Sequence, residues 1–118
     1  MIKILIADDE PLVRAGIKAV IPWNDHGFDV IGEVSDGNEA YEKILALKPD
    51  ILITDIKMPG MDGITLLKKL KQEKVPIQSV VLSCFDEFEL VREAMKYGAR
   101  DYICLLYTSD AADDLLCV

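Results

Sequence analysis

Short runs of branched apolar residues alternate along the chain with segments in which apolar residues recur every three or four positions. The runs lie at residues 2–7, 28–34, 51–54, 79–83 and 101–104. Such runs, bounded by polar or turn-forming residues, are typical of strands buried on both faces of a parallel sheet. The amphipathic segments between them, near residues 11–21, 38–47, 64–72 and 87–97, predict helices. The alternation predicts right-handed βαβ units and an α/β fold.

Acidic residues stand directly after two of the predicted strands. Asp8 and Asp9 follow the first strand, and Asp55 follows the third. Ligands in open α/β sheets bind beyond the carboxyl ends of the strands, so the three carboxylates meet there if the two strands are neighbours. Because like charges repel strongly at short range, the cluster predicts a bound cation. Mg²⁺ fits, since it takes oxygen ligands and usually only one or two protein carboxylates.

A carboxylate beside a cation can also act as a nucleophile. Attack by an aspartate oxygen on phosphorus forms an acyl phosphate, and the metal offsets the charge that develops. Asp55 is the best candidate because it stands alone at its strand end. The backbone carbonyl of Lys57 can add a neutral metal ligand, and Ser83, at the end of the fourth strand, can hydrogen-bond a phosphoryl oxygen. Each residue alone has a plainer interpretation as a turn, cap or surface residue, so the joint pattern carries the prediction.

Composition narrows the class of protein. The 118 residues predict one domain, and the net charge of −8 disfavours direct binding to nucleic acid. No apolar stretch approaches the roughly 20 residues that span a bilayer, and the first residues lack a signal-peptide pattern, so we expect a cytoplasmic protein with no membrane contact. The three cysteines lack a C-x-x-C pair, and His26 is the single histidine, which leaves little material for a zinc site or a serine-type triad.

Four ordered segments carry a family resemblance: ILIADDE (4–10), DILITDIKMPGMDG (50–63), VLS (81–83) and GARDY (98–102). Over about residues 1–104 the chain resembles the receiver domain of bacterial two-component response regulators. The resemblance implies a flavodoxin-like three-layer fold, with a doubly wound five-stranded parallel sheet of order 2-1-3-4-5 and five surrounding helices. It implies phosphorylation of Asp55 by a sensor histidine kinase, and no enzyme activity beyond autophosphatase activity.

The resemblance also assigns roles to the other candidate residues. Asp9 and Asp55 would bind Mg²⁺ with the Lys57 carbonyl, and Asp8 would assist. Ser83 and Tyr102 would match the hydroxyl and aromatic positions that change arrangement after phosphorylation. Residues 21–30 are similar to receivers fused to AraC-type helix-turn-helix output domains, which implies transcription regulation through an output domain that these 118 residues do not contain. A homodimer is a further partner that the resemblance allows.

The end of the chain departs from the family pattern. Receivers usually carry a Lys-Pro pair three residues beyond the aromatic position, and counting from Tyr102 places Leu105 there. The missing lysine would make a charge-assisted contact to the phosphoryl oxygens. A helix could begin at Thr108 or Ser109, although its apolar pattern is thin. We interpret residues 105–118 as an atypical segment, a foreign replacement of helix five from a truncated gene joined to vector- or adapter-like coding sequence.

Two other functions stay open on this reasoning. A switch-impaired receiver fragment would act only as a protein-interaction module. A haloacid-dehalogenase-like phosphatase would also use an aspartyl nucleophile, but it needs a second acid two residues later, where Lys57 stands.

Overall fold

The computed structural model describes residues 1–84, 88–105 and 116–117, and for residues 83, 84, 88, 101–105, 116 and 117 it describes the backbone alone. The strands are β1 (Ile2–Ala7), β2 (Phe28–Val34), β3 (Ile51–Asp55), β4 (Gln78–Cys84), β5 (Asp101–Leu105) and β6 (Leu116–Cys117). The helices are α1 (Pro11–Val20), the single 3₁₀ turn η1 (Trp23–His26), α2 (Gly37–Leu47), α3 (Gly63–Gln72) and α4 (Phe88–Lys96). The strand and helix segments predicted from the apolar pattern are therefore present, and the predicted first residue of the last helix, residue 87, lies outside the described residues.

The strands form one sheet in the order β2-β1-β3-β4-β5-β6. The first five are parallel, which confirms the predicted order 2-1-3-4-5. The two-residue strand β6 was not predicted; it pairs antiparallel with β5, with Leu116 opposite Leu105. An edge strand presents unpaired N–H and C=O groups, so β5 offers a place for such pairing. The helix predicted to begin at residue 108 or 109 lies outside the described residues.

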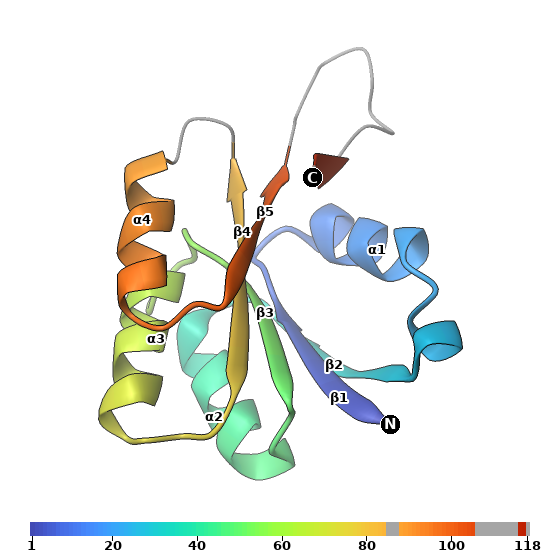
Figure 1. Cartoon of the computed structure of the whole chain (residues 1–118), viewed down its shortest axis with the longest axis horizontal. Coiled ribbons are helices and arrows are strands. Elements are labelled where there is room, and N and C mark those ends of the chain that lie inside the picture. The colour runs from blue at the N-terminus through green and yellow to red at the C-terminus, as the bar shows by residue number, and fades with distance from the viewer. Residues whose placement is uncertain (85–87, 106–115, 118) are drawn as a thin grey trace.

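Helices cover the sheet on both faces, as the three-layer prediction requires. In the described part of the chain, α1 and η1 lie on one face, and α2, α3 and α4 lie on the other (Figure 1). Right-handed crossovers between parallel strands produce this arrangement when the strand order reverses at β1. The carboxyl ends of β1 and β3 therefore lie at the point where ligands bind in folds of this kind.

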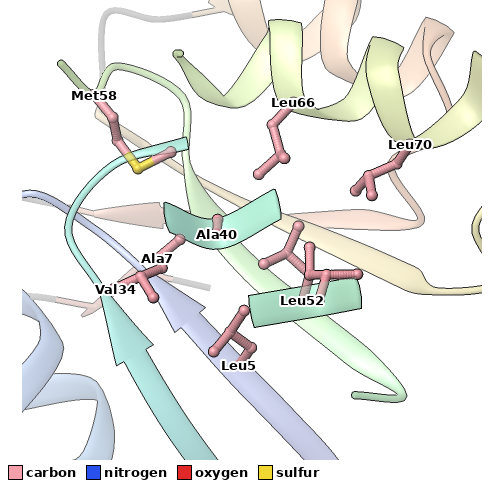
Figure 2. Packing of buried hydrophobic residues seen from close by; sticks show 9 residues of the cluster. Leu5, Ala7, Val34, Ala40, Leu52, Met58, Leu66 and Leu70 are labelled. Atoms are coloured by element: carbon pink, nitrogen blue, oxygen red, sulfur yellow. The ribbon is translucent and has the colours of Figure 1, made fainter. Parts of the chain in front are cut away.

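The core explains why the strands are almost continuously apolar. Successive side chains of a strand point to opposite faces, and both faces are covered here. In β1, Leu5 and Ala7 pack in a cluster with Leu52 and Leu66, on the side of α2 and α3 (Figure 2). Ile4 and Ile6 belong to the cluster on the α1 side, whose buried members also include Ile17, Ile53 and Leu82. A third cluster lies between the sheet and the helices α3 and α4.

Two aspartates begin helices next to the candidate site. The Asp36 carboxylate accepts a hydrogen bond from the Glu39 N–H at 2.8 Å, and the Asp62 carboxylate accepts one from the Thr65 N–H at 2.8 Å. Both are N-caps, which satisfy amide donors that lack a partner inside the helix. Because of these caps, α2 and α3 begin one residue earlier than the apolar pattern predicts.

Candidate functional site

The carboxyl ends of β1 and β3 lie side by side at one edge of the sheet. Ala7 pairs with Thr54 in the parallel register. Asp8, which follows β1, and Asp55, which ends β3, therefore leave the sheet at the same level. The condition on which the predicted cluster depended, that these two strands are neighbours, is confirmed.

The three predicted aspartates come together at this edge. One carboxylate oxygen from each of Asp8, Asp9 and Asp55 lies within 4.8 Å of the other two. Asp8 is only 1% exposed, Asp55 is half-buried and Asp9 is exposed. Solvent thus reaches the cluster from the side of Asp9, while Asp8 forms its buried end.

Backbone amides orient two of these carboxylates. The Glu10 N–H donates to Asp8 Oδ1 at 2.8 Å, and the Ile56 N–H donates to Asp55 Oδ1 at 2.7 Å. The Thr54 hydroxyl donates to the backbone carbonyl of Asp55 at 2.9 Å. Carboxylates whose orientation is already fixed lose less freedom when they bind a ligand.

Asp8 is the member of the cluster that most needs a cation. Burial raises the pKa of Asp8 to about 6, and the negative charges of Asp9 and Glu10 act in the same direction. The Glu10 N–H and, to a smaller extent, the Arg14 guanidinium lower this pKa but do not offset the burial. A divalent cation reverses such a penalty because it stabilises the ionised form. A cluster of three carboxylates, of which Asp8 is buried, fits a hard, oxygen-preferring ion such as Mg²⁺.

Three residues that support the Asp8 backbone, Arg14, Lys18 and Glu33, were not identified from the sequence. Arg14, on α1, donates from Nη1 to the Asp8 carbonyl oxygen at 2.6 Å and from Nε to Glu33 Oε1 at 3.1 Å. Lys18 binds the other carboxylate oxygen of Glu33. The hydrogen bonds from Lys18 and Arg14 lower the pKa of Glu33, and that from Lys18 has the larger effect. The available signal was the spacing of Arg14 and Lys18, one helical turn apart; their partner depends on the β1–β2 register, which the sequence does not reveal.

The loop that follows Asp55 is anchored at both ends. The Gly63 N–H donates to the Ile56 carbonyl at 2.7 Å, and the Gly37 N–H donates to the Met61 carbonyl at 3.0 Å. A Cβ on Gly63 would lie 2.1 Å from the Asp55 carbonyl oxygen, and one on Gly37 would lie 2.0 Å from the Met61 carbonyl oxygen. The two close approaches require glycine, and they hold the loop that leaves Asp55 against α2 and α3.

The remaining predicted residues are placed by their backbone. Lys57 lies in the loop after β3, with an exposed side chain. Ser83 pairs with Cys104, and Tyr102 pairs with Val81, in the β4–β5 register. The side chains of Ser83 and Tyr102 lie outside the described part of the chain, so their hydroxyl and aromatic roles stay predictions. Leu105 ends β5.

Comparison with known proteins decides the family. The profile of the response regulator receiver domain matches residues 4–104. The chain belongs to this family. The receiver is 50% identical over 103 residues to the uncharacterized transcriptional regulatory protein YesN of Bacillus subtilis, which covers 87% of this chain and 28% of YesN. It is 36% identical over 103 residues to the transcriptional regulatory protein HptR of Staphylococcus aureus, covering 87% of this chain and 40% of HptR.

Solved structures support the same assignment. The REC domain of AraT, a response regulator from Geobacillus stearothermophilus, superimposes with a TM-score of 0.80 at 42% identity, over 88% of this chain and 81% of that one. The response regulator domain of Thermotoga maritima CheB gives a TM-score of 0.77 at 34% identity, over 88% of this chain and 78% of that one. The receiver therefore has the flavodoxin-like α/β fold predicted from the sequence.

Membership of the family establishes the general role of this domain in signalling. The receiver is a phosphoacceptor module of two-component signalling, and it is a signalling domain of a kind that is generally not an enzyme. Receiver domains generally bind Mg²⁺ at an acidic pocket, and this chain gathers three aspartates at the ends of β1 and β3. The chain spans about 28% and 40% of the length of these two curated relatives. Among the described residues, every helix is too short or too polar to cross a membrane.

Proposed function

We propose that Asp55 accepts the phosphoryl group in this receiver, and that Asp8 and Asp9 complete an Mg²⁺ site beside it. The observation that supports this proposal is the convergence of the three carboxylates, whose oxygens lie within 4.8 Å of one another. Asp55 is the nucleophile because it ends β3, is half-buried, and has Oδ1 oriented by the Ile56 N–H.

The donor in the proposed transfer is a phosphohistidine of a sensor histidine kinase. A carboxylate oxygen of Asp55 attacks phosphorus, and the new O–P bond forms as the P–N bond breaks. The electron pair of the broken bond stays on the imidazole nitrogen, and the ring leaves neutral because its other nitrogen carries a proton. Mg²⁺, when bound, supplies positive charge that offsets the charge on the transferring phosphoryl oxygens. Water can later hydrolyse the acyl phosphate, which is the autophosphatase activity proposed for this domain.

Residues around the nucleophile divide the remaining work. Asp9 and Asp55 would bind the metal directly, together with the backbone carbonyl of Lys57, and Asp8 would act through a water molecule. Ser83 would hydrogen-bond a phosphoryl oxygen, and Tyr102 would change position with it. Phosphorylation shifts the equilibrium between two arrangements only if these contacts favour one of them.

The wider role follows from the relatives. YesN and HptR are named as transcriptional regulatory proteins. We propose that this receiver, too, controls a DNA-binding output domain, that its partner is a sensor histidine kinase in the cytoplasm, and that it can form a homodimer. The family match ends at residue 104, which supports a receiver core over residues 1–104 and an atypical segment from 105 to 118.

Mass spectrometry of the intact protein tests the central proposal. With Mg²⁺ and acetyl phosphate, the wild-type chain should gain one phosphoryl group, and Asp55→Asn should gain none. Asp29→Asn is the matched control, because it removes the same charge from an exposed position on β2. Phosphorylation of Asp55→Asn to the wild-type extent, or of wild type in excess EDTA, would contradict the proposal.

The two alternatives are not favoured. A haloacid-dehalogenase-like phosphatase would need an acid at the position of Lys57, and repeated turnover of p-nitrophenyl phosphate in excess of the protein would be its signature. A switch-impaired receiver fragment that acts only as a protein-interaction module would bind its partners equally well with and without phosphorylation.

A further inference from the structure

We propose that Arg14 is a positioning residue for the metal site: it fixes the peptide that joins Asp8 to Asp9, so that both carboxylates stay within reach of Asp55. This inference rests on the proposed function, because it concerns the affinity of the same aspartate cluster for Mg²⁺.

The backbone on both sides of the Asp8 side chain is tied to neighbouring elements. The Asp8 N–H donates to the Val34 carbonyl at the end of β2, at 3.0 Å. The Asp8 carbonyl, which belongs to the peptide joining Asp8 to Asp9, accepts the 2.6 Å hydrogen bond from Arg14 Nη1. The direction of that peptide decides where the next carboxylate points. Arg14 thus acts on Asp9 as well as on Asp8.

The Arg14 guanidinium is itself held in place. Its Nε donates to Glu33 Oε1 at 3.1 Å, and the side chain is only 18% exposed. Glu33 lies on β2 opposite Ile6 of β1, and its second oxygen is bound by Lys18. The planar guanidinium therefore bridges α1, β2 and the residue after β1, which a single ammonium group cannot do with the same geometry.

Arg14 could affect Mg²⁺ binding through its positive charge or by positioning the peptide between Asp8 and Asp9, and the two roles predict opposite effects of removing it. A cation near the site repels Mg²⁺, so a purely electrostatic role predicts tighter metal binding when Arg14 is removed. A positioning role predicts weaker binding, because a carboxylate that must be reoriented binds less well. The hydrogen bond is made to a backbone carbonyl, so it orients the peptide without using a carboxylate oxygen that the metal needs.

The test is a calorimetric titration of the 118-residue chain with MgCl₂, without phosphodonor. Arg14→Met should weaken Mg²⁺ binding about tenfold, as loss of a residue that orients metal ligands typically does. Lys18→Met is the matched control: it removes the same charge from the same helix and also loses a bond to Glu33, yet it should bind Mg²⁺ no more weakly than wild type. Arg14→Lys keeps the charge but cannot hold both partners, so its affinity should fall between wild type and Arg14→Met.

Thermal denaturation of each metal-free variant, followed by circular dichroism, separates folding from positioning. A residue with only a structural role would lower the melting temperature and leave the Mg²⁺ affinity of the folded protein unchanged. Arg14→Met binding Mg²⁺ as tightly as wild type, or Lys18→Met losing as much affinity as Arg14→Met, would overturn the inference. If Arg14→Met fails to fold, Arg14→Lys decides by the same criterion. A wild-type chain that binds no Mg²⁺ would instead overturn the proposed function, and this inference with it.

Discussion

Replacing Asp8 by asparagine removes the charge from the most buried carboxylate of the aspartate cluster while keeping the shape of the side chain. The folded protein raises the pKa of Asp8 from 3.8 to about 6. Below pH 3.8 the carboxyl group is protonated in both folded and unfolded states. Between pH 3.8 and 6 the unfolded state ionises while the buried carboxyl group of the folded state keeps its proton, so the stability present at low pH is lost as the pH rises to 6.

The size of this effect follows from the pKa. A rise from 3.8 to about 6 corresponds to about 3 kcal/mol of free energy of unfolding, with Asp8 only 1% exposed. Without metal, Asp8→Asn should therefore be more stable than wild type at pH 7.5 by up to about 3 kcal/mol, and the advantage should vanish near pH 4. Mg²⁺ at ten times its Kd for wild type should return about 1.4 kcal/mol to wild type and less to the variant, which binds the ion more weakly.

Urea denaturation at pH 4, 6 and 7.5, with EDTA or MgCl₂, measures these differences. Asp29→Asn, at an exposed position, serves as the control for loss of one negative charge. A stability difference between Asp8→Asn and wild type that stays constant from pH 4 to 7.5 would refute the argument. Equal stabilisation of both proteins by Mg²⁺ would refute the assignment of Asp8 to the metal site.

Three further changes test the core, the loop after Asp55 and the end of β5. Leu5→Ala leaves a cavity at a fully buried position and should lower the free energy of unfolding by about 3 kcal/mol. Leu12→Ala, at a residue 75% exposed, should change it by less than about 0.5 kcal/mol, and equal losses for the two variants in urea denaturation would contradict the packing. Gly37→Ala places a Cβ 2.0 Å from the Met61 carbonyl oxygen and should cost about 2 kcal/mol in the same assay, so a neutral result would show that the loop can move. Leu105→Lys places a cation at the end of β5 and should speed phosphorylation by acetyl phosphate about tenfold, as a charge-assisted contact to the phosphoryl oxygens allows. An unchanged rate in a mass-spectrometric time course would contradict the role predicted for a lysine at this position.

The local pattern was sufficient to predict the five parallel strands, the helices α1 to α4 and the aspartate cluster, but not β6. Strands buried on both faces must be apolar almost throughout, so the runs around Leu5 and Leu52 were recognisable without any knowledge of their neighbours. The aspartates after them stood out because a charge directly after such a run lies at a strand end, where α/β folds bind ligands. The main local feature missed was the pair of N-caps at Asp36 and Asp62, and for this reason the predicted starts of α2 and α3 were one residue late.

The sequence by itself thus determined which chemical groups are present: three carboxylates at the ends of two buried strands, and a leucine where a receiver usually has lysine. Tertiary structure decided how those groups differ. Asp8 and Asp9 are adjacent and chemically identical, yet one is buried and the other exposed. The bridge from Arg14 to Glu33 depends on pairing between β1 and β2, and the antiparallel pairing of β6 with β5 was not signalled by any local pattern. Burial and register arise from contacts between distant segments, and a local pattern of polar and apolar residues does not encode them.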